Sequence, residues 1–155
     1  MRYMTNGFQP ASIVDNLGVF SMAQANETIT AGDAVHSDGT GYLTNTNVDF
    51  ASTFLGVAAA DSDNDAGADG DLDCRYIPAN ARQVYWVKAG ETLLVEIDHV
   101  GTTVNLSAND SINPGDTTCL YYGFLILKVD VSTAAIAANE YGFAKGYFVN
   151  TADES

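Results

Sequence analysis

Residues 61–73 hold six aspartates and carry the sharpest chemical signal in the chain. Hard cations such as Ca²⁺ take about six to eight oxygen ligands, which aspartates at alternate positions of a glycine-rich turn can supply. The opening Asp-x-Asp-x-Asp is similar to the start of an EF-hand loop, but Ala66 and Leu72 replace its required glycine and glutamate. Two interpretations stay open: a solvated acidic loop, which we favour, and a Ca²⁺ site of another kind. The candidate ligands are Asp61, Asp63, Asp65, Asp69 and Asp71.

Side chains that commonly catalyse reactions are scarce. The chain has two His, two Cys and only six Lys and Arg together. His99 falls on the apolar face of an expected strand and His36 in a turn region, and no Ser or Cys stands in a recognisable nucleophile motif. We therefore expect no catalytic residue, with a small β-fold hydrolase as the least favoured alternative. Cys74 and Cys119 are interpreted as small buried side chains in preference to a disulfide.

The charge balance restricts the classes of partner. Twenty Asp and Glu against six Lys and Arg give the 155-residue chain a net charge of −14. Phosphate binding depends on clustered Lys and Arg, so this charge argues against direct contact with nucleic acid and against an electrostatic membrane contact. The longest apolar run falls far short of the ~20 residues that span a bilayer. Residues 1–7 are not followed by the apolar core of a signal peptide, so we expect synthesis in the cytoplasm.

Short segments with β propensity, separated by turn residues, recur along the whole chain. They are predicted at 18–23, 34–37, 41–44, 53–59, 74–78, 83–88, 92–99, 102–106, 117–131 and 143–149. The clearest alternation of apolar and polar residues is in 92–99. The one helical signal is at 132–139, where Ser132 or Thr133 can cap an alanine-rich turn. The pattern predicts an all-β fold: a compact antiparallel β-barrel or jelly-roll-like β-sandwich with at most one short helix.

Adjacent aromatic residues indicate candidate contact surfaces. Neighbours on a strand point to opposite faces, so the two rings of such a pair cannot both serve the same core. The second ring packs either in another layer of the same chain or against a partner subunit, and interfaces favour Tyr and Trp. The candidates for an interface between copies of this chain are Tyr85, Trp86, Tyr121 and Tyr122.

The first residues differ in character from the rest. Residues 1–16 mix apolar and polar side chains without a regular period, and Pro10 interrupts any element before it. They form either a frayed end or closing strand of the chain's own sheet, or an extended arm that docks on a partner. In the second interpretation 1–26 is the arm, 27–150 the body and 151–155 a tail. The docking candidates are Tyr3, Met4, Phe8, Ile13 and Val14.

Three segments together resemble a known family. They read ETITAGDAV at 27–35 with GYL following at 41–43, FLGVAAAD at 54–61, and GETLLV at 90–95. This order of a glycine corner and two strands resembles the small decoration, or cement, proteins on the capsids of tailed viruses. The resemblance covers roughly 27–97; the length and acidity of the segment after Asp61 depart from it, and residues 117–155 have no counterpart. It implies a β-barrel or β-tulip body, homotrimers on the outer capsid surface, and an arm that reaches over the major capsid protein.

The leading expectation is therefore a virion structural protein, made in the host cytoplasm, that needs no cofactor. It would bind the outside of an assembled capsid as a homotrimer and stabilise the shell by bridging subunits of the major capsid protein. The alternative is a carbohydrate- or Ca²⁺-binding β-sandwich module of a fibre or cell surface, which would need Tyr85 and Trp86 on an exposed plateau. The acidic composition also suits salty surroundings, so a halophilic or marine host is a further hypothesis.

Overall fold

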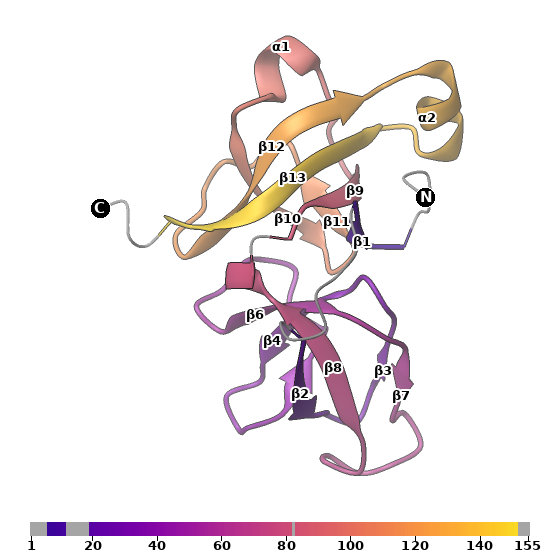
Figure 1. The fold of residues 1–155 in the computed structure, drawn as a ribbon, viewed down its shortest axis with the longest axis vertical. Coiled ribbons are helices and arrows are strands. Elements are labelled where there is room, and N and C mark those ends of the chain that lie inside the picture. The colour runs from indigo at the N-terminus through magenta and orange to yellow at the C-terminus, as the bar shows by residue number, and fades with distance from the viewer. Residues whose placement is uncertain (1–5, 12–18, 82, 152–155) are drawn as a thin grey trace.

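The computed structural model describes residues 6–11, 19–81 and 83–151. The chain is built mainly of strands, which confirms the all-β prediction. Figure 1 shows two stacked lobes, one formed by β9 to β13 with both α-helices and the other by β2 to β8. Each lobe uses one continuous part of the chain, except that β1 near the N-terminus joins the lobe of β9.

The first lobe is a closed barrel. Its order is β9-β11-β10-β12-β13, and β13 pairs back with β9. The short strand β1 pairs antiparallel with the first residues of β9. The strand β11 pairs in parallel with the last residues of β9. The bounds are β1 Gln9–Pro10, β9 Tyr85–Ala89, β10 Thr103–Ala108, β11 Ser111–Asn113, β12 Tyr122–Asp130 and β13 Phe143–Asn150. Closure leaves few open strand edges in this lobe.

The second lobe is a five-stranded antiparallel sheet in the order β2-β8-β6-β4-β5. An isolated bridge between Gln24 and Leu43 brings its two outer strands together. The pair β3–β7 lies beside this sheet as a separate ladder. The bounds are β2 Phe20–Ala23, β3 Thr28–Ile29, β4 Ala34–Ser37, β5 Leu43–Thr44, β6 Phe54–Ala58, β7 Ser62–Asp63 and β8 Asp73–Pro78.

Two short α-helices connect strands of the barrel, one more than the sequence predicted. The helix α2, Thr133–Ala138, forms where the sequence predicts it, and the Ser132 hydroxyl accepts a hydrogen bond from the Ala135 backbone N–H as its N-cap. The helix α1, Glu96–His99, lies between β9 and β10. A 3-10 turn, Ala79–Ala81, leads from β8 toward β9. Among the described residues, no helix has the length and apolarity that crossing a membrane requires.

One hydrophobic core joins the two lobes. It contains Val57 and Ile77 from the second lobe and Val87 and Ile126 from the barrel. Its centre is the Phe148 ring, whose centroid lies 5.0–5.6 Å from five other aromatic rings. Those rings belong to Phe8, Phe50, Phe54, Tyr85 and Phe124. Because they come from distant parts of the sequence, the lobes share this core and are not separate folding units.

The expected arm is wrong where the structure describes it. Gln9–Pro10 pairs with β9, and Phe20–Ala23 pairs with β8 along its whole length. Phe8 is fully buried in the shared core, so its ring belongs to this chain and not to a partner. At the other end the Thr151 backbone N–H donates to the Tyr121 carbonyl, so the folded body includes Thr151. The candidates Tyr3, Met4, Ile13 and Val14, and the tail 152–155, lie outside the described residues.

The clearest predicted strand, 92–99, is also wrong. The backbone turns at Glu91, whose φ of 65° lies in the left-handed region, and no strand pairs with the following residues. Leu94 alone turns into the core, and the chain then coils into α1. A segment can therefore alternate apolar and polar residues without pairing with a neighbouring strand. Its apolar side chains are then left exposed to solvent.

The glycine corner at 30–33 fastens the N-terminal segment to the second lobe. Gly32 has a φ of 98°, and its carbonyl accepts a hydrogen bond from the Phe8 backbone N–H at 2.8 Å. A Cβ atom on Gly32 would lie 2.7 Å from the Asn6 carbonyl oxygen, so only glycine fits. The Asp33 carboxylate accepts from the Thr30 backbone N–H and from the Asn45 side-chain amide. The corner thus helps to place Phe8 in the core.

Candidate functional site

The acidic segment 61–73 uses its carboxylates to hold backbone groups. Asp61 accepts a hydrogen bond from the Ala31 N–H at 2.8 Å, and Asp69 accepts one from the Asn26 N–H at 2.8 Å. Asp63 accepts bonds from the Thr28 hydroxyl and the Asp65 N–H, and Asp71 accepts one from the Ala68 N–H. Four of the five candidate ligands therefore act as caps that tie the loop to itself and to residues 26–31.

These contacts direct the carboxylates toward different partners. In the described part of the chain, no three His, Cys, Asp or Glu side chains are grouped as metal ligands would be. Acidity here has a structural use, because a carboxylate accepts hydrogen bonds from the unpaired N–H groups of tight turns. The Ca²⁺ site stays a prediction, and a calcium titration by calorimetry tests it.

Removing one cap is expected to weaken the fold measurably. Asp69→Ala deletes the acceptor of the Asn26 N–H and is expected to lower the free energy of unfolding by about 1 kcal/mol. Urea denaturation of the isolated protein measures it. Asp65→Ala is the matched control, because the Asp65 carboxylate makes no hydrogen bond among the described residues. Equal stability of the two variants would show that the caps contribute nothing.

Neither histidine stands in a catalytic arrangement within the described residues. His36 on β4 is fully buried against the Phe54 ring, and neither of its ring nitrogens has a hydrogen-bond partner there. Burial lowers the pKa of His36 to about 4, so the ring is neutral at pH 7. His99 lies on α1, where its Nδ1 atom accepts a hydrogen bond from the Val95 N–H at 2.8 Å. One histidine fills the core and the other fixes a turn.

Both cysteines are free thiols; Cys74 is buried, as the sequence predicts, whereas Cys119 is half-buried. Cys74 is buried among the apolar residues of the second lobe. Burial, and to a lesser extent Asp33, raises the pKa of the Cys74 thiol to about 11. Burial and the nearby Asp116 raise the pKa of the Cys119 thiol to about 11 as well. Since the thiolate is the nucleophile, both side chains are held in their unreactive form at pH 7.

The aromatic pair on β9 points to two faces, as expected, but both faces belong to this chain. Tyr85 lies in the shared core, and Trp86 packs with Phe143 and with Ala135 of α2. Trp86 is only 9% exposed, so the interface expected at Tyr85 and Trp86, and the exposed plateau for carbohydrate, are both wrong. Of the second pair, Tyr122 contacts the Phe54 ring, whereas Tyr121 is 42% exposed.

The exposed apolar side chains are concentrated where the sequence predicted a core strand. Leu93, Val95, Ile97 and Val100 surround α1, and we call these four residues the apex. Ile97 is 91% exposed. Isolated exposed aliphatic residues are ordinary, but four within eight positions form a patch of the kind that marks contact surfaces. Three of these four residues lie in the alternating segment 92–99. The alternation predicts that their side chains face the protein interior, but they face solvent.

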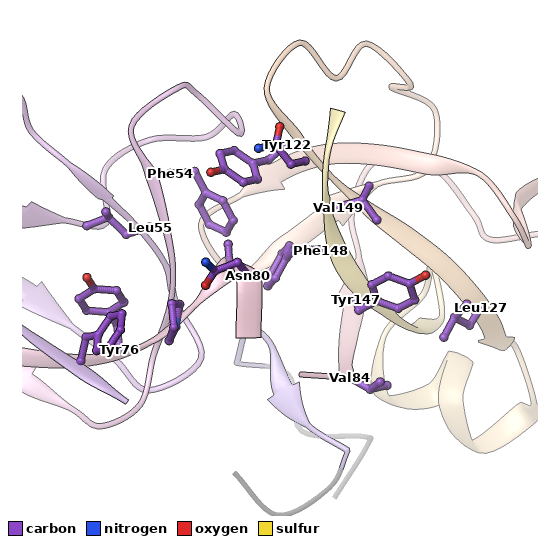
Figure 2. Close-up of a pocket in the computed structure, with 14 residues that line it drawn as sticks. Phe54, Leu55, Tyr76, Asn80, Val84, Tyr122, Leu127, Tyr147, Phe148 and Val149 are labelled. Carbon is purple, nitrogen blue, oxygen red and sulfur yellow. The ribbon is translucent and has the colours of Figure 1, made fainter. Parts of the chain in front are cut away.

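A second surface feature is a cavity of about 920 Å³ at the junction of the lobes, which we call the groove. Figure 2 shows Leu55 and Tyr76 on its second-lobe side and Leu127, Tyr147 and Val149 on its barrel side. The lining residues are Phe20, Phe54, Leu55, Tyr76, Pro78, Ala79, Asn80, Val84, Tyr122, Leu127, Tyr147, Phe148, Val149 and Asn150. No lining residue carries a charge, although the chain has 26 charged Asp, Glu, Lys and Arg side chains (20 acidic plus 6 basic).

No protein-family model matches the chain, and no curated protein matches it either. The likeness to capsid decoration proteins therefore stays a prediction from three segments. The structure pairs two of these segments directly, with Ala34 opposite Val57 and Val35 opposite Gly56. The third, 90–95, is the turn that leads to the apex and not a strand.

Proposed function

We propose that this protein is a structural component of a virion that binds the outer surface of an assembled capsid. It bridges neighbouring subunits of the major capsid protein and thereby stabilises the shell. In this role the protein needs a rigid body and contact surfaces, and it performs no reaction. The proposal includes assembly as a homotrimer and no required cofactor.

The use of its reactive side chains carries the proposal. Asp61, Asp63, Asp69 and Asp71 cap turns, His36 fills a core, and both thiols have raised pKa values. By contrast, the exposed apolar side chains of the apex have no role in packing the chain's own core. Reactive side chains with structural uses, together with an exposed apolar patch, are typical of a protein that acts by contact.

A physical advantage follows from binding assembled shells only. A ligand that binds one state and not another stabilises the first by an amount that grows with its free concentration. A protein that contacts two capsid subunits at once recognises the lattice and not the free subunit. The net charge of −14 on bound copies would also keep particles apart in solution.

Sedimentation tests the proposal directly. Purified protein, mixed with shells of the virus that encodes it from which this protein has been stripped, is expected to pellet with the shells and to raise their disruption temperature. At about 100 times the dissociation constant the gain is about 2.7 kcal/mol per site. The same protein mixed with unassembled major capsid protein is the control and is expected to remain unbound. Equal binding to free subunits, or no binding to shells in both low and high salt, would contradict the proposal.

A further inference from the structure

The apex is held rigidly above the barrel. The Val95 N–H donates to His99, and the Val100 N–H donates to the Glu96 carbonyl, which fixes α1. The Thr102 hydroxyl bonds to the His99 carbonyl, and the Gly101 N–H bonds to the Ile126 carbonyl of β12. Ile97 therefore projects from a fixed support and not from a loose loop. An ordered apolar projection loses little conformational entropy when it binds.

The groove is concave, whereas the apex projects from the molecule. It lies at the junction of the lobes, whereas Figure 1 shows α1 at the end of the barrel that faces away from the second lobe. Phe20, 53% exposed, stands at one side with its ring 6.0 Å from the Tyr76 ring. Tyr147 and Leu127 stand on the barrel side. A convex aliphatic patch and a concave uncharged surface with aromatic walls thus occur on one molecule.

The charges around the two surfaces are complementary. Glu91, Glu96 and Asp98 are exposed around the apex. Lys128 and Lys145 face each other directly across β12 and β13, a like-charge pair that destabilises a sheet when nothing compensates it. Neither lysine makes an ion pair within the described residues.

Each lysine is a near neighbour in the strand of a residue that lines the groove. Lys145 shares the outward face of β13 with Tyr147, since residues two apart on a strand point the same way. Lys128 follows Leu127, the residue at the β-bulge. Two of the chain's six basic residues thus lie beside the uncharged cavity, in a protein with twenty acidic ones.

We propose that the apex of one copy inserts into the groove of a second copy. Ile97 then enters the aromatic cavity together with its apex neighbours, and the acidic rim of the apex lies against Lys128 and Lys145. Because the two surfaces differ, the contact is head-to-tail, and such contacts close into rings when their rotation allows it. The inference rests on the proposed function, because it names the surfaces that make the proposed trimer. A pocket on the capsid protein is the alternative occupant of the apex, and the experiment separates the two.

Two single substitutions, one on each surface, test the contact by light scattering. Ile97→Asp alters the apex, and Phe20→Asp alters the groove at its second-lobe side, distant from α1 in Figure 1. Each places a carboxylate in an apolar contact and is expected to raise the dissociation constant of the oligomer ~100-fold or more, giving monomers at micromolar concentration. Val48→Asp, at an exposed position outside the groove lining, is the matched control and is expected to leave the trimer intact. Near-native circular dichroism and a cooperative melting transition of the monomers exclude unfolding as the cause.

Mixing the two variants gives a stricter test. Ile97→Asp keeps its groove and Phe20→Asp keeps its apex, so one intact contact can form between them. The mixture is expected to produce one-to-one dimers and no rings. Reversing the charges with Glu96→Lys and Asp98→Lys is expected to weaken the native trimer at low salt, and adding Lys128→Glu and Lys145→Glu in the same chain is expected to restore it.

The outcomes separate this inference from the proposed function. A wild-type monomer, an unchanged trimer in both single variants, or no dimer in the mixture would overturn the apex–groove contact, while shell binding could still hold. If Ile97→Asp abolishes shell binding but leaves the trimer intact, the apex faces the capsid and the inference is wrong. If the trimer dissociates as expected but wild-type protein does not pellet with shells, the contact stands and the proposed function fails.

Discussion

Replacing Phe8 by alanine is expected to lower the free energy of unfolding by about 3–5 kcal/mol. The ring is fully buried, and its centroid lies 5.1–6.0 Å from the rings of Tyr85, Phe124 and Phe148. The loss combines the lost transfer energy of the ring with the cavity left between rigid neighbours. Since single domains have a total stability of about 5–15 kcal/mol, this substitution removes a large part of it. Urea or thermal denaturation of the isolated protein measures the change.

Phe20→Ala is the matched control for this prediction. Phe20 has the same side chain, but it is 53% exposed, and among the described residues its ring contacts one aromatic neighbour, Tyr76. Its truncation is expected to cost under about 1 kcal/mol. If Phe8 served a partner, as an arm residue would, Phe8→Ala would leave the isolated protein as stable as Phe20→Ala does. That result would contradict the packing described here.

His36 is expected to make stability depend on pH between 4 and 6.5. The ring is fully buried, and burial lowers its pKa from an ordinary 6.5 to about 4, while the polar backbone at Asp49 opposes the shift only in part. Between these two values the unfolded chain binds a proton that the folded chain does not, so stability rises with pH. The contribution is fully present above pH 6.5 and is lost as the pH falls toward 4. The free energy of unfolding that His36 contributes is expected to be lower by about 3 kcal/mol below pH 4 than above pH 6.5.

The comparison of His36→Leu with the wild type isolates this effect. Leucine has a similar volume and no polar atoms, so the variant is expected to be at least as stable at pH 7 and to lose the slope between pH 6.5 and 4. Burial raises the pKa of Asp33, whose contribution has the opposite sign and is common to both proteins. His99→Gln is the control and is expected to keep the slope, because His36 remains. A difference in stability between the wild type and His36→Leu that stays constant from pH 7 to pH 4 would refute the prediction.

Local patterns predicted the longer strands and α2, because such an element shows its preference in its own residues. They did not predict the short strands β1, β3, β7 and β11 or the helix α1. The segment 34–37 is β4 as predicted, and Ser132 caps α2 through its hydroxyl. The adjacent rings at 85 and 86 do point to opposite faces. The sequence did not reveal that α2 covers Trp86, since that contact joins residues about fifty positions apart.

The errors have one physical origin, which is pairing between distant segments. Residues 92–99 can form a strand only beside another strand whose backbone hydrogen-bonds to theirs. The turn at Glu91 leads these residues away from the sheets. Phe8 was expected in an arm because the residues around it in the sequence show no regular apolar period. In the structure its backbone N–H donates to the Gly32 carbonyl, and its ring packs against aromatic rings of the barrel. The groove contains residues from β2, β8, β12 and β13 and has no signature in any single segment.

The meeting of Phe8 with Phe148 also bears on how the chain acquires its structure during translation. Phe8 leaves the ribosome 140 positions before Phe148, because this partner lies on β13 and emerges only after nearly the whole barrel. The nascent polypeptide must therefore hold its early aromatic residues without their final neighbours until that strand is released. Products that stop before β13 cannot complete the barrel and would expose these rings, which makes them targets for chaperones and proteases. Only chains that include β13 would then complete this aromatic core.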